Sequence, residues 1–269
     1  MSIGTNIRRI RETKKLTQEE LADRLEVTFQ AVSAWERDQY KPDTDNLIRL
    51  ADALGVTANA LVYDTPQFET KDTLFDLDRM KTYIKTTARA HGLSDTLKAV
   101  DFAAEAHKNA KRKNSDVPYI YHPLNLACHA LAMELYDDAL ISACLLHDVV
   151  EDTEYKKEDL PVSEEAQEIV QLLTKKSSAG KVSLPDYYSR ILKNPKASLV
   201  KCLDRCNNLT TMAWGFTRKK MLEYIDEVDT YYPQLLRAVK ETPEFYHAAW
   251  LLKYQIESML DIYKRLLQG

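Results

Sequence analysis

Glycine is scarce in this chain, and apolar residues recur at helical spacing along most of its length. Only six glycines occur among 269 residues. Apolar side chains that return every three or four positions indicate amphipathic helices. No segment shows sustained alternation with β-branched enrichment, and no repeat of 20–50 residues is present. The pattern predicts an all-α protein.

Length and charge limit the number of domains and the kind of partner. A chain of 269 residues fits a small domain followed by a medium one, and 45% hydrophobic with 29% charged residues suffice for a buried core. The formal net charge of −4 argues against general binding of nucleic acid, because nonspecific affinity comes from cations that neutralise phosphates. A local basic face on one domain remains compatible with it.

The sequence predicts a cytoplasmic protein with reduced cysteines and no membrane contact. The N-terminus has no apolar signal core, and no apolar run approaches membrane-spanning length. All four cysteines lie in apolar helical patterns, which favours a place in the core. A zinc site at Cys202 and Cys206, which share a helix face, is the alternative, but a second ligand pair is missing nearby.

Residues 64–72 interrupt the helical periodicity with a proline and several polar side chains, which indicates a linker. We therefore expect a first domain at residues 1–66, a linker and connecting helix at residues 67–91, and a second domain at residues 92–269.

Five short helices are predicted in the first domain. Thr17 is suited to begin the second helix and has Glu20 three residues later, which is the capping-box arrangement. Thr28 is suited to begin the third helix. Two short helices joined by a tight turn form a helix-turn-helix, whose second helix enters a major groove of DNA.

Residues 16–56 resemble the Cro/C1 repressor type of helix-turn-helix. The resemblance implies binding of double-stranded DNA as a homodimer, with Arg8, Arg9 and Lys41 near phosphates. The residues that would face DNA are Gln18, Thr28, Phe29, Gln30, Ser33 and Arg37, and their side chains suit base or backbone contacts. One departure is Glu26, where the turn usually has glycine; a positive φ there costs on the order of 1 kcal/mol. The alternative is a helical module for dimerisation or protein contact.

Four residues of the second domain form a candidate metal site. His147 and Asp148 end an apolar helix, His122 begins the preceding helix, and Asp204 lies on a later one. Mixed nitrogen and oxygen donors suit Mn²⁺, Fe²⁺ or Zn²⁺ with positions left open for water or substrate. Each residue alone has a plainer alternative, a satisfied core histidine or a capping carboxylate. We assign that alternative to three other residues, His107, His129 and His247.

The second domain resembles the HD superfamily, and within it the hydrolase domain of the RelA/SpoT homologues. The resemblance is carried by residues 106–123, 145–153, 173–175 and 201–209. It implies Mn²⁺-dependent hydrolysis of the 3′-pyrophosphate of guanosine tetra- and pentaphosphate alarmones, which releases pyrophosphate with GDP or GTP. The whole chain looks like a small alarmone hydrolase behind a repressor-type domain.

The same resemblance implies roles for further residues. Glu151 and Asp152 would orient and deprotonate the attacking water, which suits carboxylates beside a metal. The residues that would bind base, ribose and phosphates are Arg112, Lys113, Asn208, Thr211, Lys220 and Tyr224. Without the motif, exposed polar helix faces would explain the last four.

Two departures and two alternatives remain. The loop at residues 114–117 looks one residue longer than in the family, and Asn207 stands where His or Tyr is frequent. A nucleotide-sensing transcription regulator with a non-catalytic HD domain is one alternative function. Another is an HD phosphohydrolase that acts on NADPH or a nucleoside monophosphate. The intact pair Glu151 and Asp152 favours the alarmone hydrolase, because a sensor has no need to activate water.

Overall fold

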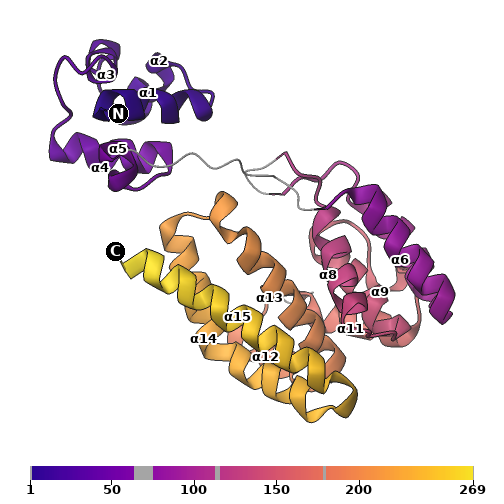
Figure 1. Ribbon diagram of the computed structural model, residues 1–269. Coiled ribbons are helices and arrows are strands. Elements are labelled where there is room, and N and C mark those ends of the chain that lie inside the picture. The colour runs from indigo at the N-terminus through magenta and orange to yellow at the C-terminus, as the bar shows by residue number, and fades with distance from the viewer. Residues whose placement is uncertain (1, 64–74, 113–115, 178–179, 269) are drawn as a thin grey trace. The chain divides into compact units, whose positions relative to one another are not determined.

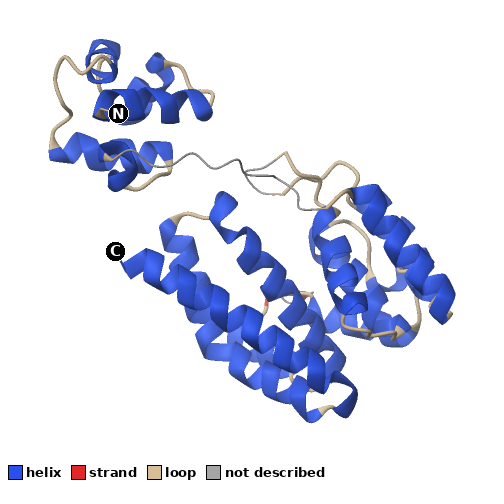
Figure 2. Cartoon of the chain, in the orientation of Figure 1, coloured by secondary structure: helices blue, strands red, loops and turns tan. Residues whose placement is uncertain are grey.

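The chain forms two compact units, residues 1–70 and 71–269. The computed structural model describes residues 2–63, 75–112, 116–177 and 180–268 (Figure 1). The linker predicted at residues 64–72 lies outside the described residues. Helices dominate both units (Figure 2), which confirms the predicted all-α class.

The first unit contains five helices around one small core. They are α1 (Ile3–Thr13), α2 (Gln18–Leu25), α3 (Phe29–Glu36), α4 (Thr44–Leu54) and α5 (Ala58–Val62). Thr17 caps α2 with the predicted capping box, in which its hydroxyl accepts from the Glu20 N–H and the Glu20 carboxylate accepts from the Thr17 N–H. Thr28 caps α3 with a single hydrogen bond, in which its hydroxyl accepts from the Ala31 N–H. These caps start both helices of the helix-turn-helix where the sequence predicts them.

A buried ion pair ties α1 to the end of α3. The Arg11 guanidinium donates from Nε to Glu36 Oε1 at 2.6 Å, and Arg11 is only 8% exposed. The hydrogen bond to Glu36 raises the pKa of Arg11. Gln18 Nε2 also donates to Glu36, at 2.6 Å. The first residue of α2 is thereby held against α3, which fixes the angle between the two helices.

The second unit is a larger bundle. Its first half contains α6 (Leu77–His91), α7 (Ser94–Ala106), α8 (Tyr121–Ala132), α9 (Asp138–Leu146), α10 (Val149–Asp152), η1 (Lys157–Asp159) and α11 (Glu164–Leu173). Its second half contains α12 (Leu184–Ile191), α13 (Pro195–Gly215), α14 (Arg218–Glu241), η2 (Pro243–Phe245) and α15 (Tyr246–Gln268). Between the halves, β1 (Lys176–Ser177) pairs antiparallel with β2 (Gly180–Lys181), a pairing that the periodicity did not indicate.

Helix α9 is the centre of this bundle. Every residue from Ala139 to Leu146 is buried, as expected for a helix that is apolar on all sides. Helices α7, α8 and α11 pack around it, and α13 contacts both α8 and α9. The long helices α13, α14 and α15 lie side by side (Figure 1). The C-terminal end of α9 therefore delivers its last residues to a point enclosed by α8 and α13.

Candidate metal centre

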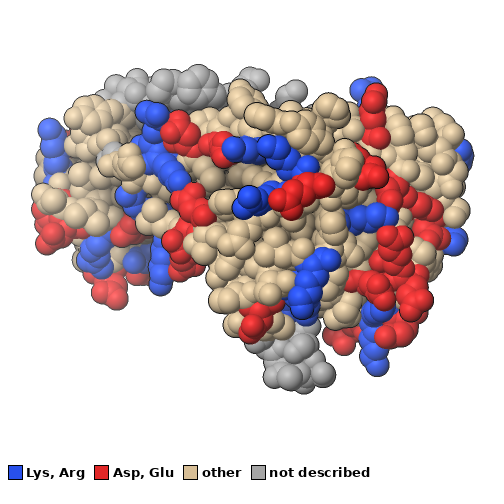
Figure 3. Space-filling model, turned by 90° about the horizontal axis from the view of Figure 1, so that it is seen from below, with Lys and Arg blue, Asp and Glu red and all other residues tan. Residues whose placement is uncertain are grey.

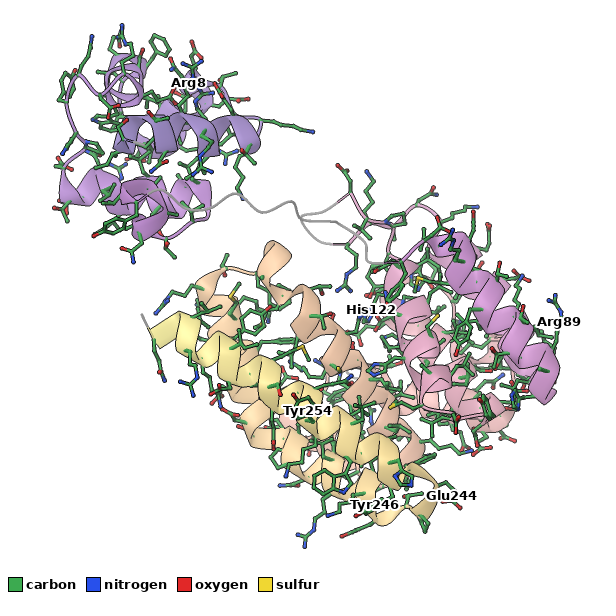
Figure 4. All side chains as sticks on the ribbon, viewed as in Figure 1. Arg8, Arg89, His122, Glu244, Tyr246 and Tyr254 are labelled. Carbon is green, nitrogen blue, oxygen red and sulfur yellow. The ribbon has the colours of Figure 1, made fainter. Side chains whose placement is uncertain are left out.

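The structure brings the four predicted ligands together from three helices. His122 is the second residue of α8, His147 follows the end of α9, and Asp204 lies in the middle of α13. Asp148 precedes α10. His147 Nε2 lies 2.9 Å from Asp148 Oδ2, and His122 Nε2 lies 3.2 Å from Asp204 Oδ1. Figure 4 shows His122 on the side of α8 that faces α13.

Hydrogen bonds set the orientation of both imidazoles. His147 Nδ1 lies 3.0 Å from the carbonyl oxygen of Cys144, which can only accept, so Nδ1 carries the proton. His122 Nδ1 lies 2.6 Å from Asn207 Oδ1, an acceptor as well. In both rings Nε2 is left to act as the ligand atom, directed at the carboxylates. Such support through the second ring nitrogen is typical of metal-binding histidines.

The donor set fits a divalent cation. Ligand atoms about 2.1 Å from one ion lie about 3 Å apart when they are neighbours, and the four histidine–carboxylate distances of the site range from 2.9 to 3.9 Å. Atoms of His122, His147 and Asp148 lie within 4.8 Å of one another. Asp204 stands slightly outside this group, with Oδ1 at 3.9 Å from His147 Nε2. His147 Nε2 is buried and lacks a well-aligned hydrogen bond, as expected of an atom reserved for a metal.

Without a cation the site holds protons. Burial lowers the pKa of His147, but the adjacent Asp148 carboxylate outweighs it and the pKa is raised to about 9. Burial likewise opposes ionisation of Asp148, but His147 nearby holds its pKa below the usual value. The pKa of Asp204 is also well below its usual value, because Lys201 and His122 outweigh its burial. A cation must therefore displace a proton to bind here.

Two acidic residues and a tyrosine lie beside the ligands. Glu151 Oε2 accepts the Lys175 N–H at 2.8 Å. Asp152 keeps an exposed side, but the surrounding protein and the neighbouring Asp148 raise its pKa. The Tyr119 hydroxyl donates to Asp148 Oδ2 at 2.5 Å. A carboxyl group with a raised pKa beside a metal site is suited to accept a proton from water.

The pocket in front of the ligands has a cationic wall. Its volume is about 230 Å³, and both Glu151 and Asp152 line it. Lys175 and Lys201 form part of the lining. Lys201 Nζ donates to Asp204 Oδ2 at 2.7 Å, whereas burial and the nearby Lys201 lower the pKa of Lys175. Lysines around an enclosed metal pocket favour an anionic substrate with several phosphate oxygens.

Most of the predicted nucleotide-binding residues gather at this pocket. The Arg112 guanidinium donates to Thr211 Oγ1 at 2.8 Å and to Asn208 Oδ1 at 3.2 Å, so these three side chains form one cluster. Tyr224 lines the pocket, with its ring 3.5 Å from the Arg205 guanidinium. Lys220 is not among the described lining residues; it lies in the exposed first turn of α14, 3.6 Å from Glu223. Lys113 lies outside the described residues.

Four residues of the site lie in the segments that carry the resemblance but receive no role from the sequence: Tyr119, Lys175, Lys201 and Asn207. Lys201 carries a local signal, because it stands three positions before its partner Asp204 on α13. Tyr119 is 29 positions from its partner Asp148 and carries none. Asn207 is 85 positions from its partner His122. Only the packing of α13 on α8 brings those two together.

In the first unit, the residues predicted to face DNA surround the start and outer side of α3. Thr28, Phe29, Gln30 and Arg37 are exposed, and Ser33 is half-buried. Gln18 is half-buried and engaged with Glu36. Of the three cations expected near phosphates, Arg8 and Lys41 are exposed, and Arg9 is half-buried. On the face of the molecule in Figure 3, Lys and Arg are interspersed with Asp and Glu.

Family comparisons match both units. Residues 7–61 match the helix-turn-helix family, and residues 99–220 match the HD domain family. A guanosine-3′,5′-bis(diphosphate) 3′-pyrophosphohydrolase of Aquifex aeolicus is 30% identical over 170 residues, 60% of this chain but 22% of the relative. One of Xenopus tropicalis is 33% identical over 139 residues, 48% of this chain and 77% of the relative.

A solved structure shares the fold of the second unit. It is a metazoan orthologue of SpoT, with a TM-score of 0.50 and 21% identity, covering 63% of this chain and 96% of that chain. The helical fold and the His/Asp set define the second unit as an HD domain. The chain belongs to the HD-domain family of guanosine-3′,5′-bis(diphosphate) 3′-pyrophosphohydrolases, and it carries a helix-turn-helix domain in front.

The helices give no support for insertion into a membrane. None of those in the described part of the chain combines the length and the apolar composition needed to cross a bilayer.

Proposed function

We propose that this chain is a Mn²⁺-dependent hydrolase of guanosine 3′-pyrophosphate alarmones that also binds DNA. The observation that supports it most is one pocket containing the His122, His147, Asp148 and Asp204 ligand set together with Glu151, Asp152 and two lysines. The family of its relatives supports the same substrate class. A domain that only senses a nucleotide has no need of the carboxylate pair.

In the proposed reaction, water attacks the phosphorus that is bonded to the ribose 3′ oxygen. The new P–O bond forms as the bond to the 3′ oxygen breaks, and that oxygen takes up a proton. A cation held by the four ligands supplies Lewis acidity, which lowers the pKa of water. Asp152, with its raised pKa, accepts the proton of the attacking water. Glu151, anchored by the Lys175 N–H, orients that water.

The cations of the pocket position the nucleotide. Lys175 and Lys201 line the pocket, and their point charges suit oxygens of the leaving pyrophosphate. The Arg112 guanidinium is planar and suited to stack on a purine, and Asn208 and Thr211 keep it in place from α13. In this proposal the base lies against Arg112, which lines the pocket.

The test of hydrolysis compares two glutamates that are three positions apart. Purified full-length protein with Mn²⁺ and guanosine tetraphosphate should release pyrophosphate and GDP in equal amounts. Glu151→Gln should lower kcat by about 100-fold or more, because the attacking water loses the carboxylate that orients it, and a misplacement of about 1 Å can cost a factor of that order. Glu154→Gln, at an exposed position, is the matched control and should keep full activity.

Release of inorganic phosphate from NADPH or a nucleoside monophosphate, with no pyrophosphate from the tetraphosphate, would contradict the proposed substrate. Absence of turnover on every nucleotide tried would support the sensing alternative.

DNA binding rests on the exposed start of α3. Gln30 is exposed there and can form two hydrogen bonds with an adenine. With a duplex selected from a random library, Gln30→Ala should lose about 1–3 kcal/mol of discrimination at one base pair. Asn59→Ala, at an exposed position of α5, should change nothing. Binding that has no dependence on salt or on sequence would contradict a reading of DNA by this unit.

A further inference from the structure

A second, larger cavity lies in the same unit as the metal centre. It occupies about 850 Å³ and is bounded by residues of α6, α8, α13 and α15. Its volume falls in the range of cavities that bind drug-sized molecules, whereas the metal pocket holds about 230 Å³. None of the residues assigned above to metal binding or to proton transfer lines it.

The walls of this cavity are mostly aromatic and sulfur-containing. The side chains that define it are Met80, Tyr83, Tyr121, Cys128, Tyr254 and Met259. Figure 4 shows Tyr254 on α15, the helix that forms one side. Amide side chains of Asn125 and Gln255 add hydrogen-bonding groups. Flat aromatic walls with a few amides suit an organic ring system with few polar atoms.

Charge separates the two cavities. Among the described residues that line the larger cavity, the charged side chains of the Arg, Lys, Asp and Glu types are Arg79 and Asp76. Their opposite charges cancel. The metal pocket instead has Arg112, Lys175 and Lys201 in its lining. Among the described lining residues of the larger cavity, a phosphorylated nucleotide would find Arg79 as its single Arg or Lys partner, and a neutral ligand avoids the cost of unpaired phosphate charges.

Two residues of α13 connect this cavity to the metal centre. Asn207 lines the cavity, and its Oδ1 lies 2.6 Å from Nδ1 of the metal ligand His122. Thr211 also lines it and accepts a hydrogen bond from Arg112 at 2.8 Å. A molecule in the cavity would therefore touch one residue that orients a metal ligand and one that orients the pocket arginine.

We propose that the cavity between α6, α8, α13 and α15 is an effector site for a neutral, ring-containing organic molecule, which strengthens metal binding through Asn207. Filling the cavity restrains the Asn207 side chain in the position that holds the His122 ring. Less freedom is then lost when the cation binds, so the metal binds more tightly. The coupling is reciprocal: a bound cation strengthens binding of the effector by the same factor.

The first experiment tests the cavity with a neutral aromatic probe. N-phenyl-1-naphthylamine, whose fluorescence increases in apolar surroundings, is titrated into the full-length protein. Ser258 lines the cavity, and Ser258→Trp should fill it and weaken probe binding at least tenfold. The adjacent Glu257 is exposed and outside the lining, so Glu257→Trp is the matched control and should bind the probe normally.

Ala132→Trp closes the cavity from α8 and provides an independent variant if Ser258→Trp does not fold. Equal probe binding by both folded cavity variants and by wild type would place the probe elsewhere on the surface and overturn the proposal. Displacement of the probe by guanosine tetraphosphate at low concentration would also overturn it, because the cavity would then be a nucleotide site.

The second experiment measures the coupling without any nucleotide. Free Mn²⁺ is followed by electron paramagnetic resonance as the full-length protein is titrated, with and without saturating probe. We expect at least about fivefold tighter Mn²⁺ binding with the probe, the lower end of typical coupling between two sites. Ser258→Trp should show no response to added probe. Unchanged or weaker Mn²⁺ binding would overturn the effector role, whatever the outcome of the hydrolysis assay.

Discussion

Side chains that are not ligands determine how the metal centre works. Asn207 orients His122, Tyr119 donates to Asp148, and Lys201 occupies one oxygen of Asp204. Each of these contacts removes a choice of rotamer or tautomer from a ligand before the cation arrives. Preorganisation of this kind raises metal affinity, since less order remains to be created on binding.

The proton on His147 makes metal affinity depend on pH. Its pKa is raised to about 9 in the metal-free chain, because Asp148 outweighs the effect of burial. Below that pH the imidazole is protonated and must lose its proton to the solvent when the cation binds. We therefore expect Mn²⁺ affinity to rise about tenfold per pH unit as the pH approaches 9, and then to level off.

Calorimetry in buffers of different ionisation enthalpy measures this proton release directly. It should give about one proton released per Mn²⁺ at neutral pH, and fewer as the pH exceeds 9. An affinity that stays constant from pH 6 to pH 9, with no proton release, would show that His147 is already neutral in the metal-free protein.

At the residue scale, the sequence was enough to predict site residues where they stand next to one another in a short motif. His147 and Asp148 are adjacent, and their position at the end of an apolar helix indicated a site. The roles of Arg112 and Asn208 came from family resemblance, and the structure places them in contact. Lys220 was expected to pair with Tyr224 at the pocket. The spacing of four does put both on one side of α14, but Tyr224 alone reaches the lining.

Among the elements, the turn between α2 and α3 carries backbone strain at Glu26, one of several non-glycine residues with positive φ. Glu26 adopts φ 53° and ψ 41°, the left-handed conformation that ends α2. A side chain at such a position costs about 1–2 kcal/mol relative to the right-handed conformation, whereas glycine adopts it freely. The ion pair that Glu26 forms with Arg49 is exposed and 3.6 Å long, so it contributes little in return.

Glu26→Gly should therefore stabilise the first unit by about 0.5–1 kcal/mol, after the greater chain entropy of glycine in the unfolded state is subtracted. Amide hydrogen exchange of α2 and α3 measures the free energy of opening in this unit alone. Glu26→Ala is the control: it loses the ion pair but retains the strained Cβ, so its stability should hardly change. Equal gains in both variants would mean that the charge, and not the backbone, limits stability.

Element starts were predictable where a single side chain caps a helix. Thr17 and Thr28 bond to N–H groups three residues later, so the signal and its effect lie within one turn. The strands β1 and β2 have two residues each, too few for any period to show. The packing of α13 against α8 depends on the whole bundle, so no short stretch of the sequence predicts it.

On the scale of the whole molecule, two hydrophobic cores are separate. One is formed by residues between Ile7 and Leu61, and the other by residues between Met80 and Leu260. Each unit buries its own apolar side chains, so each should unfold as its own cooperative transition. The proposed metal ligands all belong to the second unit, and the residues expected to face DNA all belong to the first unit.

Calorimetry of the full-length chain should accordingly show two transitions, of which only one responds to metal. Mn²⁺ at 100 times its dissociation constant should stabilise the second unit by about 2.7 kcal/mol. Asp148→Ala should abolish that shift.

Leu21 is fully buried in the first core. Leu21→Ala should therefore destabilise the first unit by about 2–5 kcal/mol, and it should lower the midpoint temperature only of the transition that does not respond to Mn²⁺. If Mn²⁺ raised both transitions, or Leu21→Ala lowered the metal-sensitive one, the two units would be thermodynamically coupled. Occupancy of the metal centre would then bear directly on the stability of the helix-turn-helix unit.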